Sequence, residues 1–151
     1  MNACCVDAAY NYATDLSPKI SIPTPQNTRG GAFYVNNAAS ITSSANRIYN
    51  CYVCDQGGAY SIISSSTTTF TDTNSFYYDT AALQGGAIYA QGAQMTMTNV
   101  DVRNLYASNG GVFYAVEVAN LNVQSSAFFN NNAIKNGGLG YFLSQKDPNL
   151  P

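Results

Sequence analysis

Apolar residues in this chain fall into short runs in which apolar and polar positions alternate, instead of into helical patterns. In the repeat that begins near residue 85 these runs cover residues 87–90, 95–100 and 102–107, separated by Gly, Gln, Asn or Asp. Val, Ile, Phe, Tyr and Thr dominate the runs, and no 3.6-residue period extends over more than a few residues. The pattern predicts an all-β chain with three short strands in each repeating unit.

Glycine pairs mark the repeat. The first glycines of successive pairs are 27, 28, 25 and 27 residues apart. A bulky apolar residue precedes each of the last four pairs by eight or nine residues, and it is Ile48, Phe76, Val102 or Phe128. A small residue lies between them: Val53, Ala81, Ala107 or Ala133. The five pairs are Gly30-Gly31, Gly57-Gly58, Gly85-Gly86, Gly110-Gly111 and Gly137-Gly138.

This repeat predicts a right-handed single-stranded parallel β-helix of about five coils. Three short strands cannot bury an apolar side alone, but coils stacked about 4.8 Å apart enclose a continuous core. Gly adopts a positive φ without steric cost, and stacked corners leave no room for a Cβ. The alternative is an antiparallel sandwich, in which the glycines mark hairpin turns. Hairpin turns would recur about every 8–12 residues without a constant sequence context, so we favour the β-helix.

Strand alternation assigns the residues after each glycine pair to two faces. We expect the bulkier set in the core: Phe33, Tyr60, Ile88 and Phe113, together with Val35, Ile62, Ala90 and Ala115. The other side would then be an exposed strip of small residues and tyrosines. That strip consists of Ala32, Ala59, Ala87 and Val112 beside Tyr34, Ser61, Tyr89, Tyr114 and Tyr141. Because an aromatic, weakly charged strip suits an interface, Tyr34, Tyr89, Tyr114 and Tyr141 are the candidate partner contacts.

The two ends differ from the repeats. Residues 1–28 contain Pro18, Pro23 and Pro25 but no glycine pair, and they predict an N-terminal cap or an atypical first coil. Residues 29–145 carry the repeats, and residues 146–151 form a C-terminal tail with two further prolines.

Composition narrows the possible partners. Charged residues make up 9 % of the chain, the net charge is −2, and six Lys and Arg are scattered singly. Without a basic patch we expect no nucleic acid partner. The 46 % of hydrophobic residues and the twelve tyrosines indicate a folded chain. No secretory signal and no apolar run long enough to span a bilayer is recognisable in this sequence.

Four cysteines occur as two close pairs, Cys4 with Cys5 and Cys51 with Cys54. Disulfides that tie the N-terminal segment to a coil, free thiols and a zinc site are all compatible with these positions. The adjacent Cys4 and Cys5 do not supply the second Cys-x₂-Cys arm of a zinc knuckle. We therefore expect disulfides, which imply an oxidising compartment, and no metal or cofactor.

Catalysis is not expected. Hydrolysis of polysaccharides requires two positioned carboxylates, but Asp79 and Asp101 fall in different columns of neighbouring coils and Asp55 lies alone near a corner. The chain has no histidine, so we expect no enzyme. Threonine rows of the kind that bind ice are confined to two coils, at 67–73 and 96–98, which favours ordinary exposed strands.

The repeats resemble those of a known family of surface proteins. Gly85-Gly86-Ala87-Ile88, its variants at Gly30, Gly57 and Gly110, and Phe128-x-x-Asn131 are similar to the GGA[ILV] and FxxN repeats of chlamydial polymorphic membrane proteins. Similar glycine pairs occur in β-helix surface proteins of protists. The resemblance covers residues 29–145. It departs from the pattern where the Asn position holds Cys51, Asp79 or Leu105.

The resemblance implies a surface-exposed β-helical adhesin. Together with the composition, it leads us to expect a structural or adhesive module of an extracellular or cell-surface assembly, such as a filament subunit. The expected partners are proteins, either further copies of the chain or other chains of the assembly. Carbohydrate is a possible second partner, because the alternative function is a carbohydrate-binding or polysaccharide-active β-helix.

Overall fold

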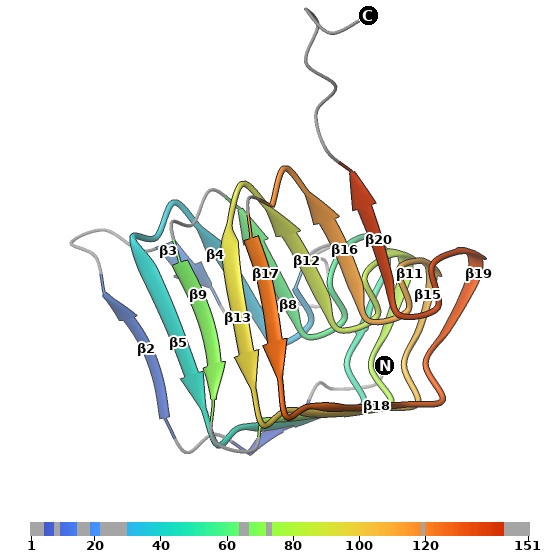
Figure 1. The fold of residues 1–151 in the computed structure, drawn as a ribbon, viewed down its shortest axis with the longest axis horizontal. Coiled ribbons are helices and arrows are strands. Elements are labelled where there is room, and N and C mark those ends of the chain that lie inside the picture. The colour runs from blue at the N-terminus through green and yellow to red at the C-terminus, as the bar shows by residue number, and fades with distance from the viewer. Residues whose placement is uncertain are drawn as a thin grey trace, which may run out of the picture.

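The chain winds into a four-sided solenoid whose strands stack along one axis, as the computed structural model in Figure 1 shows. The structure describes residues 5–7, 10–14, 19–21, 30–63, 67–71, 74–118 and 120–143. The axis runs from the blue strands to the red strands in Figure 1, so successive coils lie side by side.

Each complete coil contains four strands, one on each side of the solenoid. In the third coil they are β12 (Ile88–Gln91), β13 (Gln94–Thr98), β14 (Asp101–Arg103) and β15 (Tyr106–Asn109). The prediction of three strands is wrong, because Asn104 adopts a φ of 56° within the run 102–107 and turns the chain through a corner there. The run is therefore divided between β14 and β15.

The other coils repeat this order. The first coil contains β4 (Phe33–Asn36), β5 (Ser40–Ser44), β6 (Arg47–Tyr49) and β7 (Tyr52–Val53). The second contains β8 (Tyr60–Ile63), β9 (Thr67–Thr71), β10 (Ser75–Tyr77) and β11 (Thr80–Gln84). The fourth contains β16 (Phe113–Val116), β17 (Asn120–Gln124), β18 (Ala127–Phe129) and β19 (Asn132–Asn136). A single strand, β20 (Gly140–Leu143), follows the fourth coil.

The parallel β-helix is thus confirmed, with four complete coils in place of about five. Its right-handedness stays a prediction. Strands at the same position in successive coils pair in parallel and form four sheets. Sheet 1 contains β4, β8, β12, β16 and β20; sheet 2 contains β5, β9, β13 and β17; sheet 3 contains β6, β10, β14 and β18; and sheet 4 contains β7, β11, β15 and β19.

The strand registers align the landmarks of the sequence repeat. Ile48, Phe76, Val102 and Phe128 form one column of sheet 3. Val53, Ala81, Ala107 and Ala133 form one column of sheet 4. The predicted inner columns of sheet 1 are confirmed, since Tyr60, Ile88, Phe113, Val35, Ile62, Ala90 and Ala115 are all buried and Phe33 packs against the core.

One predicted face is wrong. Ala32, Ala59, Ala87 and Val112 do not lie on the outside of sheet 1 but are buried in the hydrophobic core. Each of them precedes the first residue of its strand and belongs to the glycine corner. Strand alternation does not extend through a corner, so a period of two cannot assign its side chains to a face.

The described corners between strands each contain a residue in the left-handed backbone region. In the third coil these residues are Gly85, Gly92, Asn99 and Asn104, with φ between 56° and 66°. The second glycine of each pair has a different reason. A Cβ on Gly86 would overlap the carbonyl oxygen of Gly111 in the next coil, so the two backbones touch without a side chain between them. Both roles predicted for the glycine pairs are present.

Three further strands lie at the start of the solenoid and run against its direction. These strands are β1 (Cys5–Asp7), β2 (Tyr10–Thr14) and β3 (Lys19–Ser21). They pair antiparallel with β6, β5 and β4, respectively, and leave the β7 edge of sheet 4 without a strand among the described residues. The domain boundaries at residues 28 and 145 stay predictions, and the tail at 146–151 lies outside the described residues.

A polar cluster lies within the core of the first two coils. The Tyr60 hydroxyl lies 2.9 Å from Ser43 Oγ, which also accepts a hydrogen bond from Asn46 Nδ2 at 2.8 Å. Ser43 Oγ donates to Asn74 Oδ1 at 3.0 Å, so the hydroxyl proton of Tyr60 is directed to Ser43. Burial raises the pKa of Tyr60. The cluster satisfies most of its polar groups internally, as a buried network must.

Alanine substitutions at two equivalent glycines test the corner stacking. Gly86→Ala should lower the free energy of unfolding by at least about 2 kcal/mol, because the new methyl group overlaps a backbone carbonyl that cannot move freely. Gly138→Ala should change it by less than about 0.5 kcal/mol, since the nearest atom to its Cβ would be the Asn131 carbonyl oxygen at 3.5 Å. Urea unfolding followed by circular dichroism measures both. Equal losses in the two variants would contradict the stacking argument.

Candidate functional surfaces

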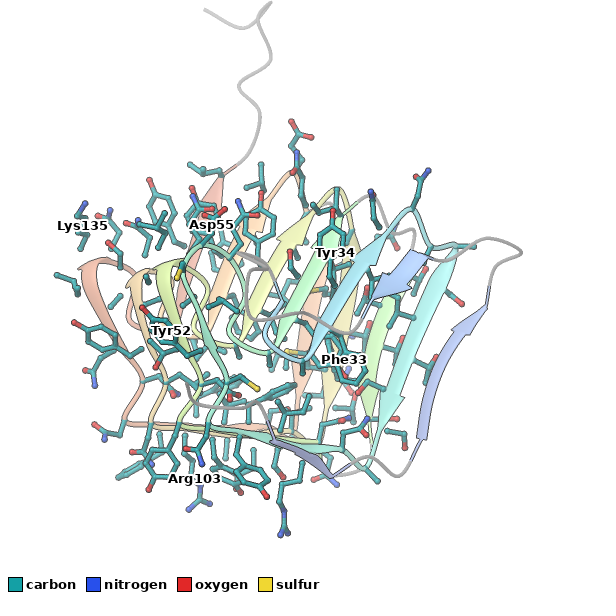
Figure 2. All side chains as sticks on the ribbon, turned by 180° about the vertical axis from the view of Figure 1, so that it is seen from behind. Phe33, Tyr34, Tyr52, Asp55, Arg103 and Lys135 are labelled. Carbon is teal, nitrogen blue, oxygen red and sulfur yellow. The ribbon has the colours of Figure 1, made fainter. Side chains whose placement is uncertain are left out.

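The four candidate tyrosines do form a column on the outside of sheet 1. The registers place Tyr34, Ser61, Tyr89, Tyr114 and Tyr141 in line. The rings of Tyr89 and Tyr114 are stacked with centroids 5.7 Å apart, and those of Tyr114 and Tyr141 are 5.3 Å apart. Figure 2 shows Tyr34 on β4 at the opposite end of this column.

The expected exposure of this strip is wrong at its centre. Tyr89 and Tyr114 are only 6 % and 7 % exposed, and Ser61 is fully buried. Each ring covers its neighbour, the Tyr89 hydroxyl lies 3.2 Å from Gln91 Oε1, and Gln84 hydrogen-bonds the Tyr114 hydroxyl. Desolvation accordingly raises the pKa of Tyr114. A partner could reach only the edges of these rings without rearrangement, and their role as partner contacts stays a prediction.

The cysteines divide into two environments. Cys51 is buried, whereas Cys54 is an exposed free thiol. Cys4 and the side chain of Cys5 lie outside the described residues, so their pairing stays a prediction. Among the described residues, no three His, Cys, Asp or Glu side chains gather as a metal site would require.

The carboxylates that could have formed a catalytic pair are separated by the wall of the solenoid. Asp79 is fully buried at an inner corner position, whereas Asp101 lies on the outside of sheet 3. Asp101 Oδ1 accepts a hydrogen bond from Arg103 Nε at 2.8 Å, and Oδ2 accepts one from the Tyr77 hydroxyl at 2.8 Å. Burial alone raises the pKa of Asp101, but these two bonds outweigh it and hold the pKa below its usual value.

Asp79 occupies the Asn position of the sequence repeat, and the structure explains what this position does. In the fourth coil, Asn131 Oδ1 accepts the backbone N–H of Leu105 at 3.1 Å and its Nδ2 donates to the Val102 carbonyl at 3.2 Å. The side chain thus binds the backbone of the preceding coil with both polar atoms. Cys51, Asp79 and Leu105 occupy the equivalent position in the first three coils, and Asn131 occupies it in the fourth.

At Asp79 only half of this arrangement is present. Oδ1 accepts the N–H of Cys51 at 2.9 Å, but Oδ2 is buried with no hydrogen-bond partner among the described residues. Desolvation raises the pKa of this carboxyl well above its usual value, although the Cys51 bond lowers it. A protonated Asp79 could donate to the Ile48 carbonyl, which stands to Asp79 as the Val102 carbonyl stands to Asn131, two coils earlier in the stack. In that protonated state the acid would make the same two contacts as asparagine.

The C-terminal end of the solenoid exposes its core. Met97 and Ala115 are 0 % and 2 % exposed, but their neighbours in the same columns, Val123 and Phe142, are 38 % and 55 % exposed. Of the ten large hydrophobic side chains that are exposed in the described residues, six lie at or beyond Val123. They are Val123, Phe129, Ile134, Leu139, Phe142 and Leu143. We call the surface formed by β17, β18, β19 and β20 the C-terminal end.

A second surface, which the sequence analysis missed, lies on the outside of sheet 3. Arg47, Tyr49, Asn50, Tyr77 and Tyr78 line an open pocket of about 340 Å³ there. The available signal was the alternation around each bulky landmark, because the residues on both sides of Ile48 and Phe76 must face outward. Figure 2 shows Arg103 of the same sheet pointing away from the solenoid.

Comparisons of this chain with protein-family models, with curated proteins and with solved structures find no match. No helix in the described part of the chain has the length and apolar character to cross a membrane.

Replacing Asp79 with asparagine should stabilise the protein in a pH-dependent way. Because the pKa is raised in the folded state, the native chain binds this proton more tightly than the unfolded chain, and stability falls as pH rises above about 4 toward the folded pKa. Asp79→Asn should gain about 1–3 kcal/mol at neutral pH, since the amide can donate to the Ile48 carbonyl, and less near the unfolded pKa. Urea unfolding across pH measures the difference.

The reciprocal substitution is the matched control. Asn131→Asp places a carboxyl at the equivalent position of the fourth coil and should destabilise the protein at neutral pH, with recovery in acid. A gain from Asp79→Asn that does not vary with pH would show that ionisation of Asp79 is not its cause.

Proposed function

We propose that this chain is a structural β-helix module of a larger assembly, in which a second copy pairs with its C-terminal end. The observation that carries the proposal is the exposure of core columns at Val123 and Phe142. Exposed sheet edges with apolar side chains favour pairing with further strands. An extracellular or cell-surface location and an adhesive role belong to the same proposal, as does a disulfide at Cys51, which would form in an oxidising compartment.

The hydrogen bonds between coils favour a partner that presents β-strands to the C-terminal end, as a further coil would. The backbone N–H groups of Val100 and Leu105 donate to side chains of the following coil, Ser126 Oγ and Asn131 Oδ1. The equivalent N–H groups of Ser126 and Asn131 face the C-terminal end, where no described coil supplies an acceptor. A strand edge offers such acceptors along its whole length, whereas a flat apolar partner does not.

A second copy of the same chain suits this edge for three reasons. A twofold axis across the C-terminal end would bring each of its strands against an antiparallel strand of the copy. The pairing of β1, β2 and β3 with the first coil supports the ability of a coil edge to accept antiparallel strands. The fourth coil carries only Glu117 and Lys135 as charged residues, so little like-charge repulsion opposes the contact.

The expected product is a closed dimer, not a filament. Three of the four sheets at the opposite end already pair with β1, β2 and β3, so that end offers a different edge. An isologous contact uses the same surface on both copies and therefore closes after two subunits. Other chains of a surface assembly would then bind the sides of the solenoid.

A single lysine at the C-terminal end tests this function. The wild-type chain should be dimeric by sedimentation equilibrium across a dilution series. Val123→Lys should be monomeric, because the ammonium group would be buried without a partner in the dimer yet remains solvated in the monomer. Its circular dichroism spectrum should match that of the wild type.

Leu83→Lys is the matched control. Leu83 is 51 % exposed on β11 in the second coil, away from the C-terminal end, so this variant should remain dimeric. A wild type that is monomeric at every concentration, or a Val123→Lys variant that still dimerises, would overturn the proposed contact.

A further inference from the structure

Two asparagine–glycine steps occupy equivalent corners of the solenoid. Asn109 is the last residue of β15 and precedes Gly110, and Asn136 is the last residue of β19 and precedes Gly137. Asparagine is a chemically labile residue. A following glycine makes it more so, because a backbone nitrogen beside a Cα without a Cβ can approach the side-chain amide carbon of the asparagine. The chain therefore carries the same reactive step twice, in two different surroundings.

The step at Asn109 is enclosed by the fourth coil. Gly110 is buried, and its N–H donates to the Asn136 carbonyl at 2.9 Å. Asn109 Oδ1 accepts a hydrogen bond from Asn136 Nδ2 at 2.9 Å, so the fourth coil also holds the side chain. An attack on Asn109 would require the Gly110 nitrogen to leave its acceptor and Asn109 to leave the strand conformation. The coil stacked on this corner opposes both movements.

The step at Asn136 lies on the C-terminal end and is open. Asn136 and Gly137 are both exposed, as is the adjoining Gly138. β19 is the last strand of sheet 4 among the described residues, so no described coil stacks on this corner (Figure 1). A Cβ on Gly111 would overlap the Gly138 carbonyl oxygen, whereas a Cβ on Gly138 would meet no atom nearer than 3.5 Å. The backbone of this corner can therefore rotate without displacing a neighbouring coil.

Local opening distinguishes the two steps. Ring closure brings the glycine nitrogen onto the side-chain amide carbon, and the extended backbone of a strand must rotate before these two atoms can meet. The free energy of such opening ranges from near zero at frayed ends to the full unfolding free energy in the core. Asn109 has a coil on each side, whereas Asn136 is held by the third coil alone among the described residues. Asn136 should thus open far more often.

We propose that Asn136 is a site of covalent modification by deamidation, and that the fourth coil protects Asn109 from the same reaction. A base in the solvent removes the proton of the Gly137 amide, and the nitrogen lone pair forms a bond to Cγ of Asn136. The Cγ–Nδ2 bond breaks, and Nδ2 takes up a proton from solvent and leaves as ammonia. Water then opens the succinimide ring to give aspartate or isoaspartate. The reaction consumes water and releases ammonia, with no oxidation or reduction.

The product alters the C-terminal end in two ways. A carboxylate at position 136 cannot donate to Asn109 Oδ1, so the amide contact between the third and fourth coils is lost. Isoaspartate also adds a methylene group to the backbone between β19 and the glycine corner. Both changes would weaken the pairing of a second copy with this end. That consequence rests on the proposed function, whereas the modification itself does not.

Peptide mapping by mass spectrometry measures both steps in one chain. The full-length protein is incubated in mildly alkaline buffer at a concentration at which sedimentation equilibrium shows monomers. Asn136 should deamidate at least about tenfold faster than Asn109, because its corner opens more easily. In the urea-unfolded chain the two steps should react at similar rates. Each folded rate is divided by its unfolded rate, which removes the influence of the neighbouring residues in the sequence.

Two variants use a residue that the chain itself places at this corner. Gln56 and Gln84 hold the equivalent position in the first two coils, where Gln56 Nε2 donates to Gln84 Oε1 at 2.9 Å. Asn136→Gln should therefore keep its melting temperature, and it should lose the reaction because glutamine must close a larger, less favoured ring. Asn109→Gln is the matched control and should leave the rate at Asn136 unchanged.

Equal normalised rates at Asn136 and Asn109 in the folded monomer would overturn the proposal. Concentration separates this result from the proposed function. If two copies pair through the C-terminal end, Asn136 should be protected in concentrated samples and reactive in dilute ones. A chain that stays monomeric should react at Asn136 at every concentration, which would contradict the dimer and still support the modification site.

Discussion

Every coil of this protein touches the next at a corner where two glycine backbones meet without a side chain between them. Gly86 N–H donates to the Gly110 carbonyl at 3.0 Å, and a Cβ on Gly86 would overlap the carbonyl of Gly111. This contact sets the distance and the register of the coils. Once it is set, the strands on all four sides fall into parallel pairs, because a shift of one residue would turn the core columns outward.

The same stacking makes each coil depend on the one that follows. Inward polar side chains such as Asn131 bind the backbone of the preceding coil, and the apolar columns are covered only where another coil lies over them. An end of the solenoid is therefore an unfinished surface and not simply the last piece of the fold. At the start, β1, β2 and β3 complete three of the four sheets by antiparallel pairing. The C-terminal end has no such strands in the described residues, and we assign it to self-association.

The sides of the solenoid differ in what they offer a partner. On sheet 1 the tyrosines pack against one another and expose little of their rings, so that the column mainly adds stability between coils. On sheet 3 the aromatic residues line an open pocket together with Arg47 and a strained corner at Tyr78. The difference arises from the hydrogen-bond partners near each sheet, since Gln84 and Gln91 engage the sheet 1 hydroxyls while Asp101 binds Tyr77 and leaves Tyr78 exposed.

The sequence by itself determined the solenoid, because its constraint is local and repeated. A glycine pair followed by alternating apolar residues predicts the corner, the strand and its inner face together. The columns that contain Ile48 and Val53 follow from the repeat period alone. It could not determine the fourth strand in each coil, since Asn104 can either continue a strand or turn a corner. It also misplaced Ala87, whose direction depends on the corner geometry, and overestimated the exposure of Tyr89 and Tyr114. These rings are buried by residues of the adjacent coils. Residues of an adjacent coil likewise determine that Asp79 Oδ2 has no hydrogen-bond partner among the described residues and that a pocket forms at Tyr78. Only the tertiary structure decides such contacts, because they depend on which side chains meet across the stack and not on the order of residues within one coil.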